Sequence, residues 1–246
     1  MRILVTFAVD AEFAPWRKLR AFQKSKSAGT DCFSTKIGEN EINVLLTGIG
    51  CRKAWLEATK VLWNGDVDIC ISSGLAGGLR DAHRLGEVLV AENVLASKWD
   101  RAIACDALLV DSAVATGAKK VKAFYTADHV ILRSSDKRNL SVFGDAVEME
   151  SGEVLLEAAA FGAKVAAIRS ISDTVDEDLP LDFNKAAGDS GEVSMRRIVG
   201  SVASAPASIP ALVRFGRQSR RAAESLAVFL ERYLQKMVAA PVGVRS

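Results

Sequence analysis

The chain has 246 residues, of which 49% are hydrophobic and 25% charged, as in an ordinary globular protein. A chain of this length can form a large core without disulfides or a bound metal. The 32 basic and 30 acidic residues nearly balance, and this disfavours a dedicated nucleic-acid-binding protein. No run approaches the roughly 18 apolar residues of a membrane span, so we expect a protein of the cytoplasm.

Short apolar runs alternate with helical patterns, which predicts a doubly wound or otherwise mainly parallel α/β sheet. The first run has the length of a signal-peptide core, but Asp10 and Glu12 follow it directly and no small-residue cleavage site is present. Helical spacing predicts helices over 51–64 and 149–161, and Gly162 suits the end of the second. The expected strands are 2–9, 42–47, 67–73, 87–94, 120–125 and 164–171.

The last third of the chain has a different pattern. Residues 174–193 are polar, and acidic at first, which predicts a mobile loop. Helical spacing resumes from about 194 to 237, with interruptions expected near Pro206 and Pro210. Four arginines fall on one broad face of this segment: Arg214, Arg217, Arg220 and Arg221. Neither an internal repeat nor a Pro/Gly linker divides the sequence, so we expect one domain over 1–246 with a helical C-terminal extension over about 190–240.

Cysteine and histidine are poorly placed for a metal site. The cysteines at 32, 51, 70 and 105 are not closely spaced, and His83 and His129 lie far apart. Cys70 lies inside an apolar run, where a buried, reduced thiol is expected. A Cys/His zinc site is therefore not expected, and nothing else in the sequence implies a metal or an organic cofactor.

Two glycine tracts follow expected strands, at 48–50 (GIG) and 74–78 (GLAGG). Such tracts let backbone N–H groups approach an anion or a sugar closely, although tight turns also need glycine. Neither tract fits the GxGxxG or GxxxxGK[ST] pattern, which disfavours dinucleotide and Walker-type sites. The glycines alone therefore assign no ligand.

Three acidic residues follow apolar runs: Glu12, Glu150 and Asp173. The carboxyl ends of parallel strands are where open α/β sheets bind ligands, so we expect these acids in one cleft. A carboxylate can accept hydrogen bonds from both hydroxyls of a ribose, and an aspartic acid with a raised pKa can protonate a leaving group. Singly, Glu150 could be a helix-start acid, Asp173 an N-cap and Glu12 a solvated surface residue. Together they favour an enzyme.

Five motifs occur in order between about residues 1 and 185: 8–12 (AVDAE), 47–50 (TGIG), 73–79 (SGLAGGL), 147–150 (VEME) and 171–173 (ISD). With these motifs the chain resembles the nucleoside phosphorylase and nucleosidase superfamily, especially the methylthioadenosine/S-adenosylhomocysteine nucleosidases. The resemblance implies a three-layer α/β/α fold around a mixed, partly barrel-like sheet. It also implies cleavage of the N-glycosidic bond of a purine nucleoside.

The resemblance implies catalytic roles for three positions. Asp173 would protonate the purine N7, Ser172 would hold Asp173, and Glu12 would position and deprotonate an attacking water. These roles are chemically coherent, because protonating the leaving group and placing a carboxylate nearby both stabilise an oxocarbenium-like transition state.

The resemblance also implies binding contacts around the nucleoside. Glu150 would bind the ribose hydroxyls, with Met149 against the sugar. Val130 and Ile131 match the base-binding segment, and Phe183 matches an aromatic residue of the pocket for the 5′ substituent. The tract with Gly74, Leu75 and Ala76 would also contact substrate.

Departures from the family pattern bear on the nucleophile. Leu75 stands where these enzymes commonly carry a hydroxyl residue, which in phosphorylases helps to bind phosphate, and no arginine precedes Ser73. Arg52 is a possible anion ligand, with an exposed helix-start arginine as the ordinary alternative. Water is therefore favoured over phosphate.

Two regions differ from the nucleosidases. The segment between Val94 and Val121 is short, which predicts a trimmed loop over the nucleoside. The tail after residue 190 diverges, and with 147–151 (VEMES) it resembles the hopanoid-associated phosphorylases, which act on an adenosine bearing a large lipid at its 5′ carbon.

The leading hypothesis is a nucleosidase that releases adenine from a 5′-modified adenosine. The alternatives are a phosphate-dependent phosphorylase of the hopanoid-associated type and a non-catalytic nucleoside-binding protein. A flavodoxin-like regulatory domain would leave the three acids unexplained. We expect a homo-oligomer, most simply a dimer, and no nucleic-acid partner.

Overall fold

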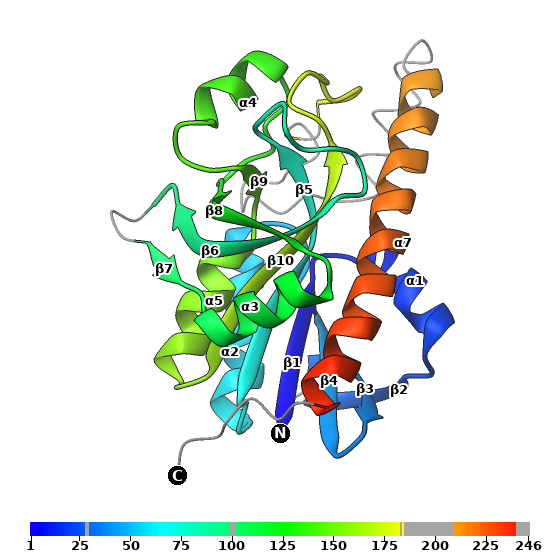
Figure 1. The fold of residues 1–246 in the computed structure, drawn as a ribbon, viewed down its shortest axis with the longest axis vertical. Helices are drawn as coiled ribbons and strands as arrows, with labels where there is room; N and C mark the ends of the chain where they lie inside the picture. The colour runs from blue at the N-terminus through cyan, green and yellow to red at the C-terminus, as the bar shows by residue number, and fades with distance from the viewer. Residues whose placement is uncertain (28–29, 99–101, 183, 185–208, 240–246) are drawn as a thin grey trace.

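A computed structural model describes residues 1–27, 30–98, 102–182, 184 and 209–239. Within these residues, ten strands form one mixed sheet (Figure 1). They are β1 (Arg2–Phe7), β2 (Gln23–Ser27), β3 (Thr30–Ile37), β4 (Asn40–Leu46), β5 (Ile69–Gly78), β6 (Val88–Ala96), β7 (Ile103–Ala104), β8 (Lys119–Thr126), β9 (Ala146–Glu148) and β10 (Lys164–Asp173). All six strands expected from the sequence are present, each with ends shifted by a few residues.

Part of the sheet closes on itself. β5 pairs with β10, β10 with β6, β6 with β8, β8 with β9, and β9 returns to β5. The rest of the sheet extends from β5 through β1 and β4 to the antiparallel strands β3 and β2. The expected mixed, partly barrel-like sheet is therefore confirmed.

Helices cover both sides of the sheet. They are α1 (Asp10–Leu19), α2 (Cys51–Asn64), α3 (Ala107–Thr116), α4 (Ser134–Leu140), α5 (Ser151–Ala160) and α7 (Ile209–Ala239). α2 packs on α5 on one side, and α7 packs on α1, α3 and β10 on the other (Figure 1). This arrangement confirms the three-layer α/β/α fold.

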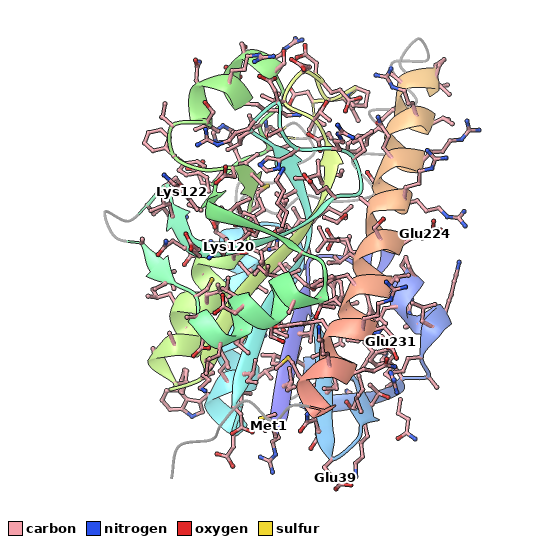
Figure 2. All side chains as sticks on the ribbon, viewed as in Figure 1. Met1, Glu39, Lys120, Lys122, Glu224 and Glu231 are labelled. Carbon is pink, nitrogen blue, oxygen red and sulfur yellow. The ribbon has the colours of Figure 1, made fainter. Side chains whose placement is uncertain are left out.

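The long helix α7 is anchored by its C-terminal half. Leu226, Leu230 and Leu234 are fully buried there, and the Tyr233 hydroxyl donates to the Leu109 carbonyl at 2.9 Å. Glu231 lies where α7 meets α1 (Figure 2) and accepts hydrogen bonds from the Trp16 indole and the Arg20 guanidinium. The four arginines of the N-terminal half are exposed, as their shared face predicts.

Two predictions for the C-terminal third need correction. Pro210 does not interrupt a helix; it lies in the first turn of α7, where the missing N–H has no helical acceptor. Residues 174–182, expected to be mobile, are bound to the chain before α4: Leu179 N donates to Leu132 O at 2.9 Å, and Ser134 N donates to Asp178 at 2.8 Å. Pro206 and the segment 185–208 lie outside the described residues.

The glycine tract 74–78 is another correction. It was expected as a break after a strand, but β5 continues through it to Gly78. Its backbone pairs with β10 on one side and with β9 on the other. Because Gly74 and Gly77 lack a Cβ, they leave space for the acidic side chains described below.

Among the described residues, no helix combines the length and the apolar character needed to cross a membrane.

Candidate active site

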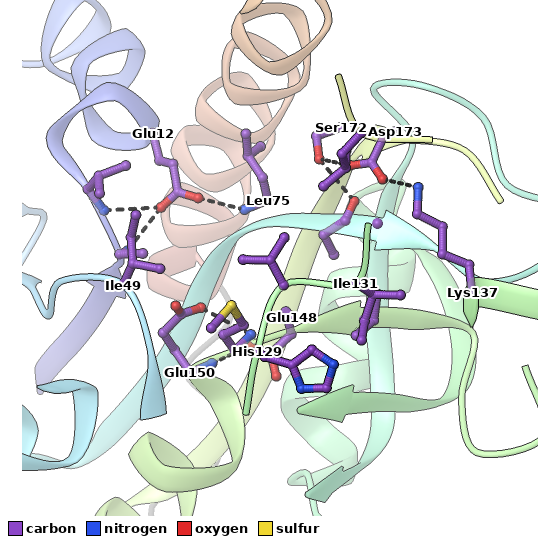
Figure 3. A pocket seen from close by; sticks show the side chains of 18 of the residues that line it. Glu12, Ile49, Leu75, His129, Ile131, Lys137, Glu148, Glu150, Ser172 and Asp173 are labelled. Atoms are coloured by element: carbon purple, nitrogen blue, oxygen red, sulfur yellow. Dashed lines mark hydrogen bonds and ion pairs between the residues drawn. The ribbon is translucent and has the colours of Figure 1, made fainter. Parts of the chain in front are cut away.

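A cavity of about 260 Å³ lies at the carboxyl ends of β1, β5 and β10. The three acids singled out from the sequence, Glu12, Glu150 and Asp173, all line it (Figure 3). Glu12 and Glu150 lie on one side of the cavity, and Asp173 lies on the opposite side (Figure 3). The predicted convergence of the three acids is thus what the structure shows.

Glu12 projects from the first turn of α1 into a cradle of backbone N–H groups. Its Oε2 accepts from Ala8 N at 2.9 Å and its Oε1 accepts from Leu75 N at 3.1 Å. Gly74, with a φ of +144°, makes this approach possible, because a Cβ there would lie 3.2 Å from the Glu12 carboxylate. Burial raises the pKa of Glu12, although Arg169 and the N–H donors oppose the rise. A raised pKa suits a group that must take up a proton near neutral pH.

Glu150 is the N-cap residue of α5, but its side chain makes no capping hydrogen bond to that helix. Its carboxylate turns instead toward the cavity, where it accepts from Gly50 N at 3.0 Å and Met149 N at 3.3 Å. The glycine tract 48–50 therefore binds a side chain of the protein itself, because its Gly50 N–H donates to Glu150. Burial, together with the neighbouring Glu148 carboxylate, raises the pKa of Glu150.

A buried ion pair lies next to these acids, between Glu148 and Arg169. The guanidinium Nη2 donates to Glu148 Oε2 at 2.7 Å and to Ser151 Oγ at 2.9 Å. Glu148 also accepts from Ser151 N at 2.7 Å and from the Thr126 hydroxyl. Burial opposes ionisation of Glu148, but Arg169 and these donors outweigh it and hold its pKa below the ordinary value. The pair fixes the turn that carries Glu150.

Asp173 ends β10 and is 6% exposed. Ser172 Oγ donates to its Oδ1 at 2.7 Å, and the Lys137 ammonium donates to its Oδ2. Gly77 lies beside it on β5, where a Cβ would come within 3.0 Å of Oδ2. Asp173 is therefore not the N-cap of a turn; it is a buried carboxyl group held at the cavity wall.

Lys137 is a site residue that was not predicted from the sequence. It lies on α4 and is 1% exposed. Besides Asp173, its Nζ donates to Thr174 O at 3.0 Å and Glu177 O at 2.8 Å. In sequence it belongs to the polar run 134–140 (SSDKRNL), which carries no signal of burial.

The remaining predicted residues fall into two groups. Six line the cavity: Leu75, Ala76, Val130, Ile131, Met149 and Ser172. The Val130 backbone is fixed by Asn184, whose amide side chain bonds its N–H and its carbonyl, each at 2.9 Å. Gly74 borders the site through its contact with Glu12. Phe183 lies outside the described residues, and Arg52 is exposed at the start of α2 and does not line the cavity.

Several cavity residues were not predicted, among them Ile49, His129, Leu179 and Phe215. Phe215 comes from the N-terminal half of α7, and Leu179 comes from the segment after β10. Neither belongs to a recognisable motif, so only the folded chain reveals them. They add apolar surface to a cavity whose charged groups lie at its two sides.

Comparison with known proteins agrees with this geometry. The family model of the Phosphorylase superfamily matches residues 2–204, and the chain belongs to this superfamily. The expectation of an enzyme is thereby confirmed. The resemblance of the C-terminal tail to hopanoid-associated phosphorylases stays a prediction.

Individual relatives are distant but cover most of the chain. The chain is 25% identical over 224 residues to a 5′-methylthioadenosine/S-adenosylhomocysteine nucleosidase from Shewanella denitrificans, covering 81% of this chain and 97% of that protein. Among solved structures, it matches the Helicobacter pylori nucleosidase of that name bound to butyl-thio-DADMe-Immucillin-A, with a TM-score of 0.74, 21% identity, and coverage of 96% and 98%. A futalosine hydrolase from Helicobacter pylori matches with the same TM-score, identity and coverage. These likenesses support the fold.

Proposed function

We propose that the chain hydrolyses the N-glycosidic bond of a purine nucleoside, with a 5′-modified adenosine as substrate and water as nucleophile. The observation that carries this proposal is the placement of Glu12. Its carboxylate is held by backbone N–H groups on one side of the cavity, with Asp173 on the opposite side. A base and an acid that flank a nucleoside from two sides are what hydrolysis requires.

The same placement supports water over phosphate. The N–H groups of Ala8 and Leu75, which could have bound an anion, already bond to Glu12. A phosphate entering this cradle would meet the Glu12 carboxylate, and like charges at close range repel. Arg52, the candidate anion ligand, does not line the cavity.

The ribose and the purine base would be held at different sides of the cavity. Glu150 would accept hydrogen bonds from the ribose hydroxyls, next to Met149 on the same turn. Asp173 would face the purine N7, with Val130 and Ile131 along the base. Proton transfer to N7 lets the base depart as a neutral leaving group.

The cavity walls support an apolar 5′ substituent. Ile49, Leu179 and Phe215 add apolar side chains, and none of them carries a group that could bind a charged 5′ phosphate. The Shewanella relative is named for methylthioadenosine, whose 5′ group is a small thioether. This supports a 5′-alkylthio adenosine as the first substrate to test.

We also propose a homo-oligomer, most simply a dimer. Three aromatic side chains on α2 and at the end of α5 are exposed: Trp55 by 44%, Trp63 by 74% and Phe161 by 42%. Sedimentation analysis of the wild type and of Trp63→Ser tests this proposal, because loss of a contact residue would shift a dimer toward monomer. Location in the cytoplasm and the assignment of a single domain stay predictions.

Release of adenine from methylthioadenosine and from adenosine, with and without inorganic phosphate, tests the function. We expect adenine and the free ribose sugar without phosphate. Strict phosphate dependence with a ribose 1-phosphate product would contradict the role of water. Absence of release from any purine nucleoside would instead support a nucleoside-binding protein.

A further inference from the structure

Lys137 is an unusual residue for its position. Of the seven residues of α4, which all lie in the described part of the chain, Lys137 is the buried one. Burying an ammonium group is costly unless the charge is paired and all its donors are bonded. Lys137 meets both conditions, since its Nζ bonds Asp173 Oδ2 and the carbonyls of Thr174 and Glu177. The positive charge of the Lys137 ammonium is therefore paired with the carboxylate of Asp173.

The charged side chains around this pair are engaged elsewhere. On α4, Arg138 pairs with Asp81 and Asp176. Asp178 accepts from Arg133 and from Ser134 N. These surface charges are paired with one another. The Lys137 ammonium is paired with the Asp173 carboxylate (Figure 3).

Glu177, which contributes a carbonyl to the Lys137 ammonium, also has its side chain bonded. Its carboxylate accepts from Thr174 N at 3.0 Å and from the Gln218 amide of α7 at 2.9 Å. The Glu177 carboxylate is thus directed to its own loop and to α7. Asp173 is the carboxylate that bonds Lys137.

Both oxygens of the Asp173 carboxyl group are engaged by hydrogen-bond donors. Oδ1 accepts from the Ser172 hydroxyl and Oδ2 accepts from the ammonium. The proposed reaction nevertheless requires Asp173 to give a proton to the purine N7. In this arrangement a transferable proton is carried by Lys137. Building on the proposed function, we propose that Lys137, which lines the cavity beside Asp173, supplies this proton through Asp173 as a positioning and proton-supplying residue.

The proton and electron balance of the step is simple. The bond between C1′ and N9 breaks, and its electron pair goes to the base. N7 takes a proton from Asp173, and Asp173 takes one from the Lys137 ammonium, which becomes a neutral amine. Water forms the new bond to C1′ and gives its proton to Glu12. Exchange with solvent then returns Glu12 to the carboxylate and Lys137 to the ammonium.

Lys137→Arg is the most informative variant. A guanidinium keeps the positive charge and donors for Asp173, but it does not give up a proton in proteins. The positive charge beside Asp173 would therefore be retained, whereas proton supply would be lost. We expect kcat for adenosine or methylthioadenosine to fall by about 100-fold or more, in the range for loss of a general acid.

The substrate control is 7-methyladenosine, whose base already carries a positive charge and needs no proton to depart. We expect Lys137→Arg and Lys137→Gln to cleave it within about threefold of the wild-type rate. Lys120→Gln is the matched surface control, because Lys120 is an exposed lysine that pairs with Glu92 on the strands (Figure 2). This variant should cleave both substrates at the wild-type rate.

The pH profile gives a second readout. In Lys137→Gln, Asp173 must obtain its proton from solvent, so we expect the alkaline limb of kcat/KM to move to lower pH than in the wild type. Equal losses on adenosine and 7-methyladenosine in Lys137→Arg, or a wild-type rate on both, would overturn the inference. A wild type inactive on every nucleoside would instead remove the proposed function, so the two failures are distinguishable.

Discussion

The two sides of the cavity use the same functional group in different ways. At one side, Glu12 and Glu150 are held mainly by backbone N–H groups, and burial raises the pKa of both. At the other, Asp173 is bonded by a hydroxyl and a buried ammonium. A buried carboxylate whose pKa is raised by desolvation can take up a proton, whereas one paired with an ammonium can pass a proton on. The surroundings of these chemically similar carboxyl groups therefore assign proton uptake to one side of the cavity and proton delivery to the other.

The largest effect is expected from Asp173→Asn. The amide cannot deliver a proton to N7, so kcat for adenosine should fall by about 10²- to 10⁴-fold. Steady-state rates of adenine release measure this. Asp176→Asn is the matched control: it changes an exposed aspartate of the next segment, which pairs with Arg138, and should leave the rate unchanged.

Arg169→Met is expected to have the largest effect on stability. It leaves the Glu148 carboxylate buried without its partner, and breaking a buried pair in this way costs about 3–5 kcal/mol. Urea denaturation measures the loss. The double variant Arg169→Met/Glu148→Gln should recover part of it, because no unpaired charge remains. A single variant as stable as the wild type would show that Glu148 does not depend on this pair.

The variant Glu150→Gln tests the raised pKa on one side of the cavity through the pH dependence of the free energy of unfolding. The folded pKa of Glu150 lies above its ordinary value of 4.5. Its contribution to stability is therefore fully present below about pH 4.5 and is lost as pH rises through the folded pKa. The variant should show a shallower fall of unfolding free energy between pH 5 and 8, by up to about 1.4 kcal/mol per pH unit. Glu12, whose pKa burial also raises, adds a slope of the same sign, which the variant retains. Chemical denaturation at several pH values measures the slope. The same slope in the variant and in the wild type would contradict the expectation.

Phe215→Ala should have the smallest effect, confined to the 5′ group. The lost apolar contact should raise KM for methylthioadenosine by about 10-fold, in the range for a small apolar group in a pocket. KM for adenosine should change little. Phe143→Ala removes a more exposed ring that stacks on Tyr125 and serves as the control.

Most of the sheet could be predicted because its strands are apolar and β-branched, as in β1, β6 and β10. The hairpin of β2 and β3 could not, because Gln23–Ser27 (QKSKS) is polar and lies at the edge of the sheet. α4 is equally polar. Its place over the site follows from the loop before it and from the contacts of Lys137, which are long-range.

The site was predictable where residues sit in motifs and unpredictable where they come from elsewhere in the chain. Glu12, Glu150 and Asp173 each follow a strand, so topology alone brings them together. Arg169 offered a signal that could have been used: a charged residue inside the buried strand 164–171 needs a buried partner. Lys137 offered no such signal.

The most direct test compares Glu12→Gln with Asp173→Asn on adenosine and 7-methyladenosine. Single-turnover release of the base gives the rate of bond cleavage in each case. If the two sides divide the labour as described, Asp173→Asn loses activity on adenosine and regains most of it on 7-methyladenosine, while Glu12→Gln stays slow on both. Equal losses for both variants on both substrates would contradict the account.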